Sequence, residues 1–150
     1  MSSHRHPPED SLGPQPGQEH WLRLAGLFHA TPGNADDSIE IGQGRATVVR
    51  WIGGPARAGS EVLRLLDDAA LFAASSRLEG AVVQGGEIRV TFIDPRAEGP
   101  LVAHGSADIG THASVYADAE VLDVDGRVVA TGSARYSKRE AGSIPPLGHA

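Results

Sequence analysis

The chain of 150 residues contains no cysteine. This absence excludes disulfide bonds, thiolate nucleophiles and cysteine-ligated zinc, and it agrees with a reducing cytoplasm, where we expect the protein to be located. Positive charge is also scarce, with 13 Lys and Arg against 19 Asp and Glu and a net charge of −6. No basic surface of the kind that nucleic-acid binding requires is evident. No apolar run approaches the ~20 residues of a membrane span. We therefore expect neither nucleic acid nor a membrane as a partner.

One folded domain is expected, over residues 18–139. Residues 1–17 are rich in Pro, Ser and Gln and lack the apolar stretch of a secretory signal, so they predict a disordered N-terminal arm. Residues 140–150 predict a loose C-terminal tail. The sequence thus predicts a single core with a tail at each end.

Two segments have the spacing of helices. Residues 19–30, EHWLRLAGLFHA, place apolar side chains at helical intervals and predict a short amphipathic helix lying on a larger body. Residues 57–76, RAGSEVLRLLDDAALFAASS, form a longer run of helix formers. Glycines and a proline precede this second segment and Gly80 follows it, which marks its two ends.

The remaining segments have the composition of strands. Residues 38–52 are rich in β-branched side chains and have glycines at their centre, which predicts two strands joined by a tight turn. About four further strands are predicted after Gly80, and Asp125-Gly126 is a strong signal for the turn of the last hairpin. Strands grouped on either side of a long helix indicate an α+β fold in which one antiparallel sheet packs on that helix.

The long helix carries two adjacent carboxylates, Asp67 and Asp68. At 100° per residue, Asp68 lies on a polar stripe with Arg64, where the two can pair in solvent. Asp67 lies about 90° from that stripe, between Leu63 and Leu71. A structural role is open for Asp67, as a boundary residue that reaches water or accepts a hydrogen bond. Because burying a charge is costly, Asp67 is nevertheless the candidate functional residue.

The start of the same helix, Ala58-Gly59-Ser60, leaves backbone N–H groups uncovered at the positive end of the helix dipole. Such a terminus can bind an anion or a developing oxyanion. We expect no metal site, because the two histidines near the N-terminus have no further ligands within sequence reach. His112 could contact a ligand phosphate, although an exposed loop histidine is the simpler interpretation.

Over residues 35–138 the chain resembles the hotdog-fold acyl-CoA thioesterases, in particular the branch similar to the phenylacetate-pathway enzymes. The segments that carry the resemblance are LLDDAALFAASS, EIRVTFIDP, GPLVAHGSADIG and DVDGRVVATGSARY. The resemblance implies a curved antiparallel sheet wrapped around one long central helix, and two subunits that pair as a homodimer or as a dimer of dimers. It also implies an active site at the subunit interface and no cofactor apart from coenzyme A as part of the substrate.

The resemblance further implies roles for particular residues. Asp67 would be the general base or nucleophile, and the N–H of Gly59 would polarise the thioester carbonyl. Ser60, Gly85 and His112 are the candidates to line the substrate site. Members of the family commonly begin this helix with His-Gly-Gly, where this chain has Ala-Gly-Ser. Three hypotheses follow: a thioester hydrolase, a non-catalytic acyl-thioester-binding or regulatory protein, and, with less support, a lyase. The acyl group and its carrier are left open.

Overall fold

The computed structural model describes residues 17–53, 58–94, 97–109 and 113–144. In chain order its elements are α1 (Gln18–Ala30), β1 (Ser38–Gly42), β2 (Arg45–Ile52), α2 (Ala58–Ser75), β3 (Ala81–Val82), β4 (Gly86–Phe92), β5 (Gly99–Ile109), β6 (Ser114–Leu122), β7 (Val128–Ser137), a 3-10 turn (Lys138–Glu140) and β8 (Gly142–Ser143).

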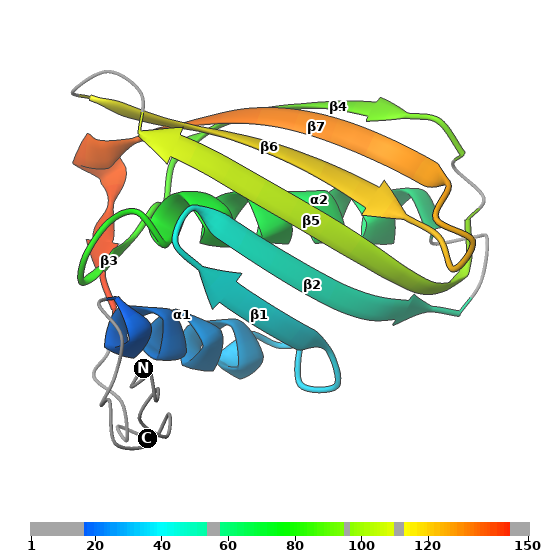
Figure 1. Ribbon diagram of the computed structural model, residues 1–150, viewed down its shortest axis with the longest axis horizontal. Coiled ribbons are helices and arrows are strands. Elements are labelled where there is room, and N and C mark those ends of the chain that lie inside the picture. The colour runs from blue at the N-terminus through cyan, green and yellow to red at the C-terminus, as the bar shows by residue number, and fades with distance from the viewer. Residues whose placement is uncertain (1–16, 54–57, 95–96, 110–112, 145–150) are drawn as a thin grey trace, which may run out of the picture.

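Six of the strands form one sheet in the order β1-β2-β5-β6-β7-β4 (Figure 1). Every neighbouring pair in this sheet is antiparallel. The turn between β6 and β7 includes Asp123, whose carboxylate accepts hydrogen bonds from the N–H groups of Asp125 and Arg127 at 2.9 Å each. The α+β architecture, the hairpin before the long helix and the four strands after it are confirmed.

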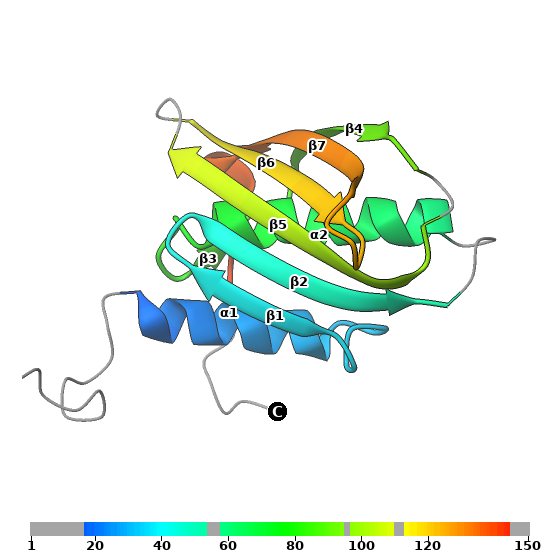
Figure 2. The same ribbon diagram turned by 45° about the vertical axis from the view of Figure 1, so that its right-hand side comes forward.

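Two helices, rather than one, pack against this sheet in the described residues. The longer helix, α2, contacts β2, β5, β6 and β7. The shorter helix, α1, lies alongside β1 in both views (Figures 1 and 2). Leu24 and Phe28 of α1 are fully buried, and the Phe28 ring meets Phe72 of α2 edge-on at 5.5 Å. The helix predicted to lie on a larger body is therefore part of the core, because its apolar stripe extends the interior beyond α2.

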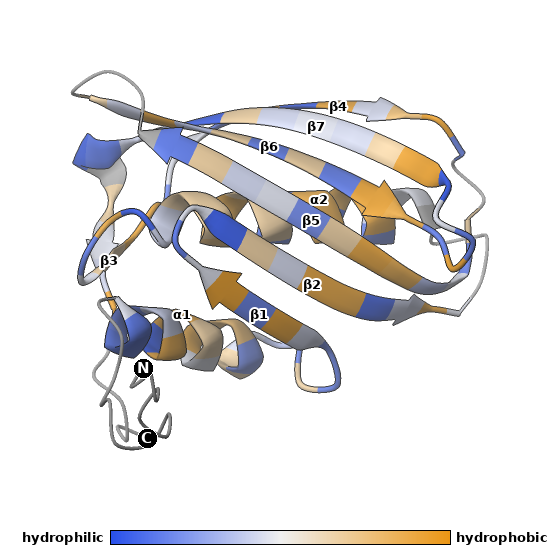
Figure 3. Cartoon of the chain, viewed as in Figure 1, coloured by the Kyte–Doolittle hydropathy of each residue, from blue (hydrophilic) through white to orange (hydrophobic). Residues whose placement is uncertain are grey.

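The alternation of the strands separates the two faces of the sheet. In β6, Val115, Ala117, Ala119 and Val121 are buried, and the side chains between them are exposed or half-buried. Hydrophobic and hydrophilic residues alternate in the same way along the neighbouring strands in Figure 3. One face of the sheet therefore carries the helices and the core, and the other is polar.

The folded part continues past the predicted boundary at residue 139. Strand β8 pairs with β3, the Ile144 side chain is 4 % exposed, and Arg23 of α1 donates to the Ile144 carbonyl at 2.8 Å. Backbone pairing and apolar burial thus hold residues 142–144 to the core, a contact that the glycine- and proline-rich composition of this end does not reveal. The rest of the predicted arm and tail, 1–16 and 145–150, lies outside the described residues. None of the described helices is both long and apolar enough to span a membrane.

Candidate functional site

Asp67 lies on α2 with its carboxyl group partly buried. The hydroxyl of Tyr136, from β7, donates a long hydrogen bond to Oδ1 of Asp67 at 3.4 Å. Burial raises the pKa of the Asp67 carboxyl above its usual 3.8, and the Tyr136 hydrogen bond opposes that rise to a smaller extent. Asp67 is therefore a half-buried carboxylate with a neutral hydrogen-bond donor beside it.

Tyr136 is 4 % exposed and lies on the core-facing side of β7, two residues after the buried Ala134. The opposite residue on β4 is Gly86, where a Cβ would collide with the Arg135 carbonyl and lie 2.8 Å from Cδ1 of the tyrosine ring. The backbone of β4 therefore packs closely on β7 beside Tyr136. Burial, followed by the negative charge of Asp67, raises the pKa of the Tyr136 phenol well above its usual value, so the hydroxyl stays protonated and donates. Our sequence analysis missed Tyr136, although its alternation with Ala134 places it on the core face.

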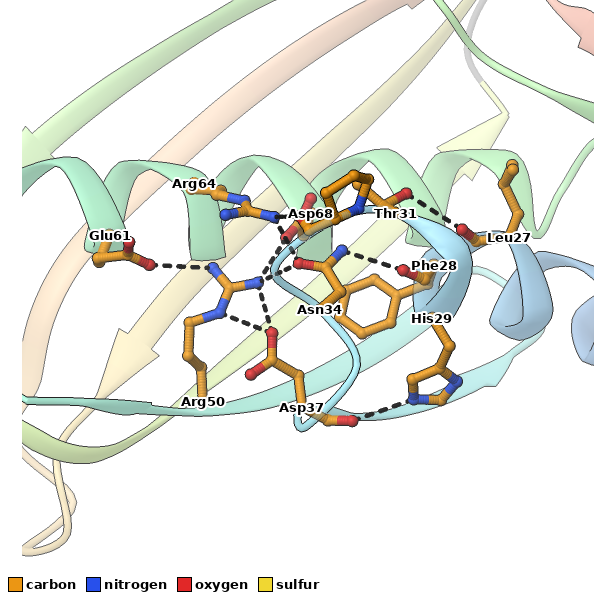
Figure 4. A network of polar contacts seen from close by, with 11 residues as sticks. Leu27, Phe28, His29, Thr31, Asn34, Asp37, Arg50, Glu61, Arg64 and Asp68 are labelled. Atoms are coloured by element: carbon orange, nitrogen blue, oxygen red, sulfur yellow. Dashed lines mark hydrogen bonds and ion pairs between the residues drawn. The ribbon is translucent and has the colours of Figure 1, made fainter.

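Asp68, the neighbouring carboxylate, lies in a network of polar contacts (Figure 4). Its partner is Arg50 of β2, which is 5 % exposed and donates to Oδ2 of Asp68 at 3.1 Å. Arg50 also donates to Asp37 at 2.8 Å and to Asn34 at 3.0 Å, both in the loop between α1 and β1. Arg64 donates to a carbonyl of that loop and to Asn34.

The prediction of a solvent-exposed pair between Arg64 and Asp68 is wrong. The Asp68 side chain is only 18 % exposed, because the loop after α1 covers this side of α2 and brings its own polar groups. Helical periodicity places residues on a face but does not show what covers that face. Burial raises the pKa of the Asp68 carboxyl, and the positive charge of Arg50 opposes the rise. The two adjacent carboxylates are thus in different surroundings: a buried guanidinium compensates Asp68, whereas Asp67 faces a phenol.

Gly59 is the second residue of α2, and a Cβ built on it would meet no atom within 4 Å. Ser60 beside it is exposed. Gly85 lies just before β4, and its carbonyl accepts from the Ser137 N–H at 3.1 Å, next to Tyr136. His112 lies outside the described residues. The structure therefore brings Gly85 to the end of β7 that carries Tyr136.

Gly59, Leu63 and Asp67 follow one another at intervals of four residues on α2. At 100° and 1.5 Å per residue, Gly59 and Asp67 are within about 80° of each other around the helix and about 12 Å apart along it. Leu63, between them, is 41 % exposed. One open face of the helix thus presents both groups, but they are too far apart to contact the same carbonyl within one chain.

Comparison with known proteins supports the fold. No family model matches the sequence, and no curated protein matches it. Among solved structures, a thioesterase family protein from Silicibacter pomeroyi is similar with a TM-score of 0.70 and 22 % identity, over 83 % of this chain and 98 % of that one. The PaaI protein of the phenylacetic acid degradation operon of E. coli is similar with a TM-score of 0.70 and 17 % identity, over 85 % of this chain and 97 % of that one.

A third similar structure is a putative thioesterase, a phenylacetic acid degradation-related protein from Ralstonia eutropha, with a TM-score of 0.64 and 18 % identity, over 78 % of this chain and 98 % of that one. The resemblance to the thioesterase superfamily is confirmed for the fold, since these chains are matched over almost their whole length. At such identities the likeness concerns the fold alone.

Proposed function

We propose that the protein is an acyl-thioester hydrolase in which Asp67 is the general base or nucleophile and the Gly59 N–H polarises the thioester carbonyl. The observation that carries this proposal is the setting of Asp67, a partly buried carboxylate with a raised pKa on the open face of α2. A structural carboxylate at such a site is expected to have a cation beside it, as Asp68 has Arg50. Asp67 instead faces the phenol of Tyr136.

The chemistry follows from the basicity of this carboxylate. A pKa raised by burial makes Asp67 a stronger base than an exposed aspartate. It can remove a proton from water that attacks the carbonyl carbon, or attack that carbon itself and form an anhydride that water then opens. In either route the C–S bond breaks, the thiolate takes a proton and leaves, and a carboxylic acid remains. The Gly59 N–H would stabilise the oxyanion that forms in between.

The substrate-binding proposals concern three further residues. Ser60, exposed beside Gly59, and Gly85, at the end of β7 that carries Tyr136, would line the path of the acyl thioester. His112 remains a proposal for contact with a ligand phosphate. The similar fold of a thioesterase family protein supports a thioester as the substrate, and we propose coenzyme A as the carrier of its acyl group. No metal or redox cofactor enters the proposed steps.

A second copy of the chain would complete the site. Attack requires the carbonyl to contact both the base and the oxyanion donor at about 3 Å, and one chain holds these groups about 12 Å apart. A two-fold axis near Leu63 would set Gly59 of one chain beside the partner's Asp67. We propose that this homodimer forms along β4, the end strand of the sheet, with α2 in the position of the central helix. Exposed apolar side chains support this surface: Leu63 at 41 %, Phe92 at 41 % and Ile93 at 58 %. Two such dimers could pair further.

The test is thiol release from a panel of short-chain, long-chain and aryl acyl-CoAs. Because the chain has no cysteine, a thiol-reactive dye reads turnover without background. We expect Asp67→Asn to lower kcat by about 10²–10⁴-fold, the usual contribution of a general base. Asp108→Asn is the matched control, since the Asp108 side chain is 98 % exposed. Equal rates for Asp67→Asn and wild type would contradict the assignment of Asp67.

The alternative function is that of a non-catalytic acyl-thioester-binding or regulatory protein. It is favoured by the start of α2, where Ala58-Gly59-Ser60 offers no side-chain base beside the proposed oxyanion donor. Isothermal calorimetry with the same acyl-CoAs separates the two functions. Tight binding to wild type without any thiol release would favour the binding protein over the hydrolase.

A further inference from the structure

We propose that Tyr136 is a positioning residue for Asp67, and that its hydroxyl fixes which carboxylate oxygen faces the substrate. This inference rests on the proposed function in its kinetic part, but the contact itself exists in the fold whatever the protein does. The hydroxyl donates to Oδ1 of Asp67 at 3.4 Å. A donor on Oδ1 leaves Oδ2 as the oxygen that takes the proton from water or attacks the carbonyl.

The tyrosine is built into the site rather than placed on its edge. Its side chain is 4 % exposed, so the ring is held by packing and the hydroxyl has little freedom to turn away. Gly86, the first residue of β4, packs directly on this part of β7. A Cβ at that position would collide with the Arg135 carbonyl and lie 2.8 Å from the tyrosine ring. The close approach of the two backbones therefore holds β4 against the strand that carries Tyr136.

The other groups around Asp67 do not offer the same contact. On α2 itself the neighbour is Asp68, whose charge is met by Arg50 from β2. Arg64, one turn before Asp68, donates to the loop after α1. The buried side chains of β5 and β6 are apolar: Leu101, Ala103, Ala107, Val115, Ala117, Ala119 and Val121. Among the described residues, Tyr136 on β7 is the polar side chain that the sheet directs at Asp67.

The hydrogen bond has a consequence for proton affinity. A donor on the carboxylate favours its ionised form, so the Tyr136 hydroxyl lowers the pKa of Asp67 against the opposing effect of burial. Without the hydroxyl, burial acts alone and the pKa of Asp67 rises further. A base must be ionised to act. The acid limb of the pH–rate profile should therefore move to higher pH when the hydroxyl is removed.

The experiment compares Tyr136→Phe with Tyr116→Phe. The chain has two tyrosines, and Tyr116 is 45 % exposed on the polar face of the sheet, so its variant controls for the loss of a phenol. We expect Tyr136→Phe to lower kcat about 10-fold at neutral pH, the effect of losing about one hydrogen bond. KM should change little. As the pH rises above the shifted limb, kcat should recover the part lost to protonation of Asp67, while the part lost because the carboxylate is no longer held in one orientation should persist. Tyr116→Phe should match wild type throughout.

A lower kcat with an unshifted acid limb would overturn the positioning role, because a packing defect lowers the rate at every pH. A second measurement does not need turnover: ¹³C NMR titration of the Asp67 carboxyl in wild type and Tyr136→Phe. We expect a higher Asp67 pKa in the variant. The same pKa in both proteins would refute the contact. If wild type hydrolyses none of the thioesters but the carboxyl pKa still rises, the proposed hydrolase fails and the Tyr136–Asp67 coupling stands.

Discussion

At the scale of residues, two adjacent aspartates on one helix have separate roles. The buried Arg50 compensates Asp68 and ties α2 to β2 and to the loop after α1. Asp67 has no such compensation from Arg50 and faces Tyr136 instead. Helical periodicity separated the two faces correctly and indicated Asp67. It could not identify Arg50 as the partner of Asp68, because Arg50 lies 18 residues earlier in the chain and is brought next to Asp68 by the packing of β2 on α2.

The first prediction at this scale concerns stability. Burial raises the pKa of Asp67 in the folded state above 3.8. The folded protein therefore binds the Asp67 proton more tightly than the unfolded chain does. The stability that this proton binding adds is lost as the pH rises through the pKa of the folded state. Asp67→Asn removes the buried charge. We expect the variant to be more stable than wild type at neutral pH, with the difference shrinking towards pH 3.8. Urea unfolding of both proteins at several pH values measures this difference in the free energy of unfolding.

A constant difference between the two proteins from acid to neutral pH would show that burial of this charge does not affect stability. A variant that is more stable and less active would match the cost that active sites commonly impose on folding.

At the scale of elements, the approach of α2 to the sheet depends on Gly105 of β5. A Cβ at Gly105 would collide with the Ala69 carbonyl and lie 3.2 Å from the Ala70 nitrogen, so the helix backbone rests directly on the strand. Gly26, in the exposed middle of α1, has open space around the position of a Cβ. An added Cβ would therefore clash with the helix backbone at Gly105 and meet no atom at Gly26.

Alanine at the two glycines should have opposite effects on stability. Gly105→Ala pushes α2 away from β5 and should cost about 1–3 kcal/mol, as overpacking does. Gly26→Ala gains helix propensity without a clash and should stabilise by about 0.5–1 kcal/mol. Thermal and urea unfolding of both variants measures the signs. A neutral Gly105→Ala would mean that α2 does not lie this close to β5.

The elements themselves were largely predictable from the sequence. The alternation along β6 and the Asp-Gly turn after it are local patterns, formed by residues that are neighbours in the sequence, so they can be predicted from the sequence. The pairing of β3 with β8 was not visible, because each strand is two residues long and the paired residues lie 60 or more positions apart in the chain. The contribution of α1 to the core was also underestimated. Phe28 of α1 packs against Phe72 of α2, and these two residues are far apart in the sequence.

At the scale of the whole molecule, the proposed site would depend on a partner that approaches α2 from the side of β4. The prediction is that Leu63→Arg, which places a charge at the proposed two-fold axis, gives monomers and lowers kcat sharply. Sedimentation equilibrium should then report 15.6 kDa for the variant and at least twice that for wild type. Trp51→Arg is the control, because Trp51 is 72 % exposed but lies on β2, near the other end of the sheet.

A wild-type protein that sediments as a monomer would remove the proposed composite site. A Leu63→Arg variant that stays dimeric would place the subunit contact elsewhere on the surface.

The two end strands of the sheet differ in their surroundings. Beside β1 lies α1, whereas in the described residues no element follows β4 in the sheet order. Unpaired backbone along an end strand is the usual starting point for uncontrolled growth of sheets into fibres. If α1 blocks strand addition at β1 and two chains pair along β4 as proposed, growth of the sheet would stop after a single step, since each chain would cover the end strand that the described residues leave unpaired in the other. The helix that completes the core would in this way also limit polymerisation.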